Sequence, residues 1–291
     1  RHIYGSVRTK SGYEAVKPRS SRDGSLIKAN GTIVAVQWAT TGFGALAVMP
    51  MRDGDQSGKG GRLVNPPLIE AHKSSLQDFD ISPFNDRLIA TSDGGAIRLW
   101  EVPEDGLSET IRTAKNELSG DCVKRLSALA FHPTSENLMT TCGKDFTLRL
   151  FDIENTSPVL AFKESHSELI LSTSWSVDGK LVATSCKDKI LRIGDPRAGK
   201  IVHSTEAHPG VKGFMATWLG YRDQIVTCGF SKNGERQMSI WDFRAFNTAL
   251  HSVPIDTSPG MMTPYYDAAT EVVFLLGRGD STIRYYEVND D

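Results

Sequence analysis

The chain has 291 residues, of which 39% are hydrophobic and 23% are charged, and its formal net charge is −2. This length allows one large all-β domain or two ordinary domains. No run of about eighteen apolar residues is present, which excludes a membrane-spanning helix, and the first ten residues lack the apolar core of a signal peptide.

Four cysteines are present, Cys122, Cys142, Cys186 and Cys228, and none forms a C-x-x-C pair. This spacing argues against a zinc site and against a disulfide framework. Four histidines, His2, His132, His203 and His251, show no spacing that would gather a metal. We therefore expect no metal and no cofactor, and a reducing, cytoplasmic location.

Seven basic and two acidic residues lie between Arg1 and Lys28, so this N-terminal segment carries a charge of +5 and the remaining chain −7. Such a segment is typical either of a solvated arm or of a docking surface for an acidic partner. Charge alone leaves both interpretations open. Nucleic-acid binding has little support, because the rest of the chain is acidic and offers no groove that would follow a phosphate backbone.

A first, degenerate unit of short strands is predicted from about Thr32 to Met51. The glycine-rich stretch RDGDQSGKGGR follows it at residues 52–62. A phosphate-binding loop would need Gly-Lys followed by Ser or Thr and then a helix, and neither is present here. We therefore predict a loop between strands.

Similar segments then recur along the chain. Five of them end in a predicted strand, at residues 91–102, 140–153, 183–196, 230–243 and 276–288. In four of the five, an acidic residue stands six positions before the end of the strand, and these acids are 43, 47 and 45 residues apart. A second set of strands repeats in step with the first, at Ile81, Phe131, Trp175, Trp218 and Tyr266. A period of about 45 residues with Trp-Asp endings predicts an all-β fold, a β-propeller, and the repeats resemble those of WD-repeat proteins.

Six four-stranded blades are predicted in a single domain over residues 1–291. They end near Met51, Trp100, Phe151, Gly194, Trp241 and Tyr286. Arg1 to Tyr4 would supply one strand of an incomplete seventh blade. Because an open propeller would expose strand edges, and because the chain starts without Met, we expect a fragment of a longer chain.

The WD-repeat pattern predicts a buried hydrogen-bond network that braces the turns. The predicted network residues are His72, Trp100, Asp145, His166, Ser185, Asp188, His208, Trp241 and Asp280. His166, Ser185 and Asp188 also have the composition of a catalytic triad. We favour the structural interpretation, because WD repeats hold a histidine, a hydroxyl residue and an aspartate at these positions. Gly194 replaces the tryptophan of that repeat, and Asp121 stands where the third blade would have its histidine.

The tripeptide Arg278-Gly279-Asp280 would suggest an integrin-binding loop in an extracellular protein. The cysteine pattern argues against that context. Asp280 also occupies the turn position of the repeat, just before a predicted strand. We therefore interpret it as a structural turn aspartate.

The resemblance narrows to one family. The motifs that carry it are RHIYG at the start, YEAVK at residues 13–17, TSCKDKILRIGDPRAG at 184–199, TCGFSKNGERQMSIWD at 227–242, DTSPG at 256–260 and GRGDSTIRYYE at 277–287. Together they resemble coronins over nearly the whole chain. FHPTSENL at residues 131–138 and ISPFNDRLIAT at 81–91 are more similar to the long coronins with two propellers in tandem than to the short ones.

The resemblance implies a non-enzymatic, seven-bladed scaffold that binds filamentous actin and regulates the actin cytoskeleton at the cell cortex. It places the actin contact at Lys17, with Arg19 and Arg22 nearby. Lys17 stands where short coronins have arginine, which loses bidentate pairing with a carboxylate. The alternative is a Golgi or vesicle trafficking scaffold with little actin affinity, since some tandem coronins are associated with that role.

Overall fold

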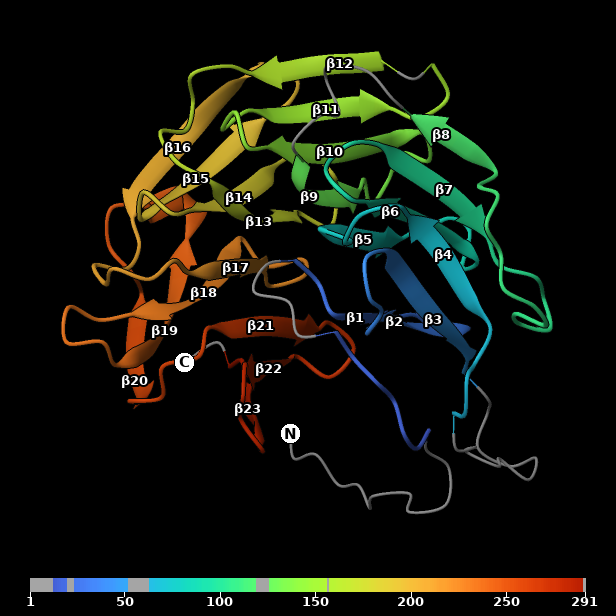
Figure 1. Ribbon diagram of the computed structural model, residues 1–291. Coiled ribbons are helices and arrows are strands. Elements are labelled where there is room, and N and C mark those ends of the chain that lie inside the picture. The colour runs from blue at the N-terminus through green and yellow to red at the C-terminus, as the bar shows by residue number, and fades with distance from the viewer. Residues whose placement is uncertain (1–12, 20–23, 52–62, 119–125, 156, 290–291) are drawn as a thin grey trace. The chain divides into compact units, whose positions relative to one another are not determined.

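The computed structural model describes residues 13–19, 24–51, 63–118, 126–155 and 157–289 (Figure 1). These residues form six antiparallel sheets, of which five have four strands and the last has three. The chain divides into two compact units, residues 2–131 and residues 132–291. We call them the first unit and the second unit.

In the first unit, each strand pairs with the next along the chain within its own sheet. The first sheet consists of β1 (Ile27–Ala29), β2 (Ile33–Trp38), β3 (Gly44–Pro50) and β4 (Leu68–His72). The second consists of β5 (Asp78–Ile81), β6 (Leu88–Ser92), β7 (Ile97–Glu101) and β8 (Asn116–Leu118). The unit ends with β9 (Leu126–Phe131).

The remaining strands follow the same meander. The third sheet has the order β12-β11-β10-β9, with β10 (Leu138–Gly143), β11 (Leu148–Asp152) and β12 (Ser157–Phe162). The fourth consists of β13 (Ile170–Trp175), β14 (Val182–Cys186), β15 (Ile190–Asp195) and β16 (Lys200–Glu206). The fifth consists of β17 (Met215–Trp218), β18 (Gln224–Phe230), β19 (Arg236–Asp242) and β20 (His251–Asp256). The sixth consists of β21 (Met262–Asp267), β22 (Val272–Gly277) and β23 (Ile283–Glu287).

The middle strands are buried on both faces. Every residue of β14 is buried, whereas the outer strand β16 is partly or fully exposed along its whole length. The sequence of a strand that is buried on both faces is a continuous run of apolar or small residues. Such burial arises where sheets pack face to face against neighbouring sheets. Each unit has its own core clusters, around Trp100 and Phe79 in the first unit and around Trp241 and Phe214 in the second.

The innermost strands are tied together by side chains. The Asp78 carboxylate on β5 accepts the backbone N–H of Leu129 on β9 at 3.0 Å. In the second unit, the Ser172 hydroxyl on β13 accepts the N–H of Ala216 on β17 at 3.2 Å. An inner strand has no hydrogen-bonded strand on one of its edges, so the backbone N–H groups on that edge need other partners. Short polar side chains of a neighbouring inner strand accept these N–H groups.

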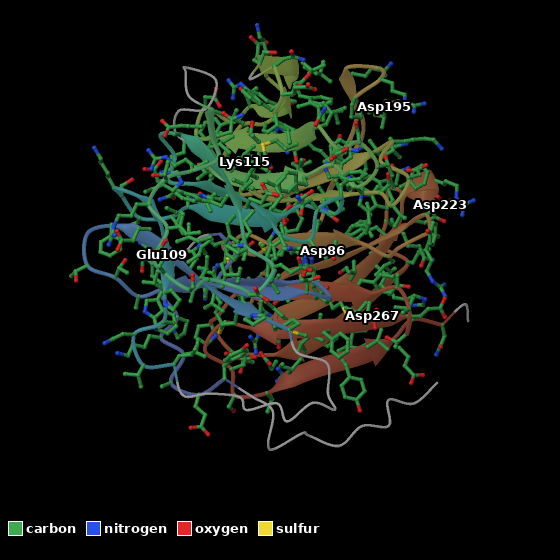
Figure 2. The ribbon with its side chains drawn as sticks, turned by 90° about the vertical axis from the view of Figure 1, so that its right-hand side faces the viewer. Asp86, Glu109, Lys115, Asp195, Asp223 and Asp267 are labelled. Carbon is green, nitrogen blue, oxygen red and sulfur yellow. The ribbon has the colours of Figure 1, made fainter. Side chains whose placement is uncertain are left out.

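The aspartate of the Trp-Asp ending has a local structural role. Asp195, at the end of β15, accepts the backbone N–H groups of Arg197 and Ala198 at 2.8 and 3.1 Å. Asp152, at the end of β11, accepts the N–H groups of Glu154 and Asn155 at 2.9 and 3.0 Å in the same manner; Figure 2 labels Asp195. These side chains close the turns that follow their strands, which explains why the repeat places aspartate there.

The strand pattern agrees with the all-β prediction and corrects the predicted number of strands in the last sheet. Each predicted blade end lies within one residue of the end of the third strand in its sheet. The sixth sheet has three described strands rather than the predicted four. One face of that sheet exposes Tyr265, Ile283 and Tyr285, which are 61%, 62% and 55% accessible. The seventh blade stays a prediction, and residues 1–4 lie outside the described part of the chain.

Candidate functional site

A buried hydrogen-bond chain joins three residues of the first unit and ends beside Asp93. Trp100 Nε1 donates to Thr91 Oγ1 at 2.9 Å, and Thr91 Oγ1 lies 2.9 Å from His72 Nε2. His72 Nδ1 lies 3.4 Å from an oxygen of Asp93. These partners assign the proton to Nδ1, so that the threonine hydroxyl donates to Nε2. Burial lowers the pKa of His72, although the Asp93 charge opposes this shift.

The same arrangement recurs in the second unit. Trp241 Nε1 donates to Thr227 Oγ1 at 2.9 Å, and that oxygen lies 2.8 Å from His208 Nε2. Gly229 makes room for the histidine, because a Cβ there would lie 2.4 Å from the ring. Burial lowers the pKa of His208 to about 4, so the ring is neutral at pH 7.

The fourth sheet differs from the predicted arrangement. Thr184, rather than Ser185, contacts His166, with Oγ1 2.8 Å from Nε2. Ser185 bonds instead to Ser172, with the two hydroxyl oxygens 2.6 Å apart. Neighbouring residues of a strand point to opposite faces, so only one of the two hydroxyls can meet the histidine. This geometry separates Ser185 from His166 and leaves no nucleophile–base pair between them.

Asp188 braces the turn before β15. Its carboxylate accepts from the Ser167 hydroxyl at 2.9 Å, from the Ile190 N–H at 3.0 Å and from both terminal nitrogens of Arg192 at 3.0 and 2.7 Å. Burial opposes ionisation, yet the Arg192 hydrogen bonds hold the pKa of Asp188 well below its usual range. The side chain is 9% exposed.

Replacing Asp188 with alanine is expected to lower the free energy of unfolding by about 1 to 3 kcal/mol, because Arg192 and the turn N–H groups lose their acceptor. The measurement is a urea denaturation curve with a circular dichroism readout. Ser185→Ala serves as a matched control that keeps the turn intact. An unchanged midpoint for the Asp188 variant would contradict the bracing role.

Asp280 belongs to an ion-pair cluster that the sequence did not predict. Arg236 lies between Asp256, at 2.6 Å, and Asp280, at 2.8 Å, and its side chain is only 1% exposed. Arg284 pairs with the same two carboxylates at 2.7 and 3.2 Å. We call these four residues the Arg236 cluster. Because Asp280 is held here with its side chain 10% exposed, it is not presented for an integrin.

The other predicted turn aspartate has a more exposed setting. Asp145 pairs with Arg149, whose Nη1 donates to it at 3.1 Å, and the carboxylate also accepts the N–H of Thr147. The Asp145 side chain is 50% exposed. Asp121, expected at the histidine position of this sheet, lies outside the described residues.

The basic N-terminal segment lies along β2. Lys17 is exposed, while its carbonyl accepts the N–H of Ala39 at 2.9 Å. The next residue, Pro18, forms a bridge with Trp38. Arg19 is half-buried, and its Nη1 donates to the carbonyl of Leu76 at 3.1 Å. Arg22 lies outside the described residues. Lys17 therefore projects from a fixed backbone, whereas Arg19 has a structural contact that the prediction of an exposed arm did not include.

Replacing Arg19 with alanine is expected to cost about 1 kcal/mol of stability, since the hydrogen bond to Leu76 is lost. A fall in Tm of roughly 2 to 4 °C would report this loss. Lys17→Ala is the control and should leave Tm unchanged. Equal Tm values for the two variants would show that Arg19 does not hold the segment.

Three family models match the chain. A domain of unknown function, DUF1899, matches residues 1–59. The WD domain, G-beta repeat, matches residues 66–101 and 113–152, and the anaphase-promoting complex subunit 4 WD40 domain matches residues 159–228. Together with the four-stranded sheets and their His-Thr-Trp networks, these matches define a WD40 β-propeller protein.

The relatives show the family. The crystal structure of the WD40 domain from Toxoplasma gondii coronin has a TM-score of 0.86 and 30% identity, and the match covers 96% of this chain and 71% of that one. The chain belongs to the coronin family. It is 35% identical to a Coronin-like protein of Saccharomyces cerevisiae over 308 residues, and 31% identical to human Coronin-2A over 300 residues. Both matches cover the whole chain, which spans 46% and 55% of the two relatives.

Membership of this family of WD40 scaffold proteins agrees with the prediction of a non-enzyme. Within the described residues, no helix is long and apolar enough to cross a membrane.

Proposed function

We propose that this chain binds actin filaments and that Lys17 makes a direct contact with filament carboxylates. The observation that carries the proposal is the fixed setting of Lys17, whose backbone is joined to β2 while its side chain is exposed. Membership of the coronin family supports actin as the partner. The implied setting is the actin cytoskeleton at the cell cortex.

Charge explains how such a contact would operate. A lysine ammonium is a compact point charge that attracts an acidic surface without a demanding geometry. Anchoring its backbone lowers the entropy lost on binding, because only the side chain must be ordered. Of the neighbouring cations, Lys28 is already paired with Asp80 at 2.7 Å and Arg19 bonds to Leu76. Among the three, Lys17 is therefore best placed to meet a partner.

Co-sedimentation of the chain with actin filaments tests the proposal. We expect the protein to pellet with filaments at low salt and to remain in the supernatant without them. A correctly folded protein that stays in the supernatant at every actin concentration would overturn the proposal and favour the trafficking scaffold. Circular dichroism of the same sample establishes that it is folded.

The proposed subgroup, tandem-propeller coronins, receives no particular support from the relatives. Mouse Coronin-7 is 36% identical over 223 residues, a match that covers 76% of this chain and 24% of that protein. Coronin-A of Dictyostelium discoideum is 35% identical over 294 residues and is matched over 64% of its length. The chain therefore has similar sequence identity to relatives of very different length, which does not favour one subgroup.

A further inference from the structure

We propose that the outer edge of β16 binds an extended acidic peptide by strand addition. Each outer strand of a meander sheet leaves one row of backbone N–H and C=O groups unpaired, which is a template for another strand. β16 is the last strand in the order β13-β14-β15-β16 and has seven residues, Lys200–Glu206, without proline. This proposal is independent of actin binding.

Four other outer strands are covered, interrupted by proline or short, unlike β16. The edge of β4 is covered by a parallel bridge between Ile69 and Ile111, with Glu70 N–H donating to Ile111. β12 and β20 carry Pro158 and Pro254, which interrupt the row of donors. β8 has only three residues among those described. β23 is the outer strand of the three-stranded sheet and also lacks a proline, but it has only five residues. Within the described chain, β16 is thus the longest outer edge that lacks both a cover and a proline.

The register of β16 identifies the backbone groups that a peptide would meet. Ala207 N–H donates inward to the carbonyl of Lys189 at 2.9 Å. Backbone direction alternates along an antiparallel strand, so Glu206 and Ser204 direct their N–H and C=O groups outward. Both residues are exposed. In antiparallel or parallel orientation, an added strand would bond at these two positions.

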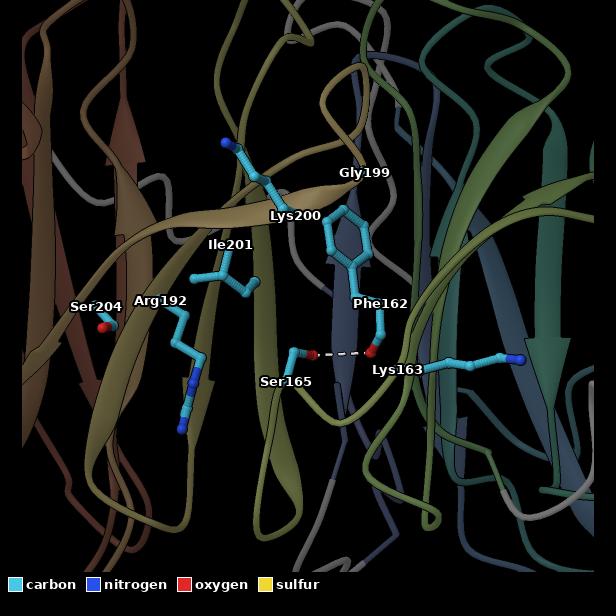
Figure 3. Close-up of a pocket in the computed structure, with 8 residues that line it drawn as sticks. All are labelled: Phe162, Lys163, Ser165, Arg192, Gly199, Lys200, Ile201 and Ser204. Atoms are coloured by element: carbon cyan, nitrogen blue, oxygen red, sulfur yellow. Dashed lines mark hydrogen bonds between the residues drawn. The ribbon is translucent and has the colours of Figure 1, made fainter.

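A pocket of about 470 Å³ lies beside this edge, between β16 and the end of β12 (Figure 3). Its apolar wall includes Phe162 and Ile201. Phe162 packs against Gly194, where a Cβ would lie 3.3 Å from the ring, at the position where the fifth sheet has Trp241. The absence of a large side chain at this repeat position lets Phe162 pack there, beside the pocket.

The charge of the pocket favours an acidic ligand. Its lining contains Lys163, Lys200 and Arg192 and no acidic residue. Arg192 is neutralised by Asp188 at 2.7 Å, whereas neither exposed lysine has an ion-pair partner among the described residues. Figure 3 shows the two lysines pointing in different directions, so they suit carboxylates spaced along a strand better than one compact anion.

Fluorescence anisotropy with a labelled peptide of about eight alternating valine and glutamate residues tests the inference. We expect binding by the wild type, no binding of the matched valine–lysine peptide, and at least a tenfold loss for Ser204→Pro, which removes one outward N–H. Ser204→Ala keeps that N–H and should bind as the wild type does. Lys163→Glu combined with Lys200→Glu should also lose about tenfold, while Lys232→Glu on another sheet should not.

Three results would overturn the inference. The first is a wild type that does not bind the acidic peptide at low salt. The second and third are a Ser204→Pro protein and a lysine double variant that bind this peptide as tightly as the wild type does. If Ser204→Pro does not fold, the lysine variant decides alone, with circular dichroism as its folding control. Co-sedimentation of Ser204→Pro with actin should match the wild type, which separates this site from the proposed function.

Discussion

Replacing Arg236 with methionine is expected to lower the free energy of unfolding by about 3 to 5 kcal/mol, because two carboxylates lose a buried counter-ion. Arg236 donates to both oxygens of Asp256 at 2.6 Å and to those of Asp280 at 2.8 and 3.3 Å. These bonds lower the pKa of Asp256 to about 2. The cluster joins β19 and β20 to the turn before β23, so its loss should reduce Tm by roughly 10 °C.

Arg284→Met is the matched control for this prediction. Arg284 contacts the same carboxylates but is 33% exposed, so water can replace part of its interaction. We expect a loss of about 1 kcal/mol or less. Thermal melting of both variants gives the comparison. Similar small losses of unfolding free energy in the two variants would show that Arg236 is not the main source of the cluster's stabilisation.

A second large effect is expected on acidification. The folded state holds the pKa of both His166 and His208 at about 4, mainly because the rings are buried, whereas an unfolded histidine has a pKa of about 6.5. A depressed histidine pKa means that the unfolded chain binds more protons between these values. Stability is therefore fully present above pH 6.5 and falls as the pH drops toward 4. At pH 5 the loss is roughly 2 kcal/mol for each histidine.

Urea denaturation between pH 7.5 and pH 5 measures this dependence. His208→Asn should be less stable than the wild type at pH 7.5, because Thr227 loses its partner, and should show a flatter pH profile. The carboxylates of the Arg236 cluster titrate lower, below about pH 4, since their pKa values are depressed. A wild type with constant stability from pH 7.5 to pH 5 would contradict the buried neutral state of the histidines.

The repeat period predicted the sheets well because each sheet repeats one local pattern of strands and turns. The tryptophan and histidine positions also follow from that pattern, as His72 and Trp100 illustrate. Asp93 was missed because it stands seven positions before Trp100, one more than in the other repeats, so that counting back six positions from Trp100 reaches Gly94. The contact between His72 and Asp93 identifies the acid of this turn.

Contacts between segments far apart in the sequence could not be predicted from the repeat pattern. Arg236 meets partners 20 and 44 residues away, and neither separation is marked by a motif. The choice between Thr184 and Ser185 depends on strand register, because a shift of one residue reverses the face of every side chain. Arg19 was assigned to an exposed arm from charge alone, which does not report a hydrogen bond to a carbonyl 57 residues away.

Co-sedimentation of Lys17→Asp with actin filaments, beside Lys144→Asp, tests the proposed function most directly. Lys144 is an exposed lysine in the turn between β10 and β11, so the two variants change charge equally. Reversing the charge at the contact should sharply reduce binding by Lys17→Asp, while Lys144→Asp binds as the wild type does. Raising salt from about 50 to about 200 mM shortens the screening length from about 14 to about 7 Å and should weaken the wild type far more than Lys17→Asp. Equal binding of Lys17→Asp and wild type at both salt concentrations, with unchanged Tm values, would contradict the account.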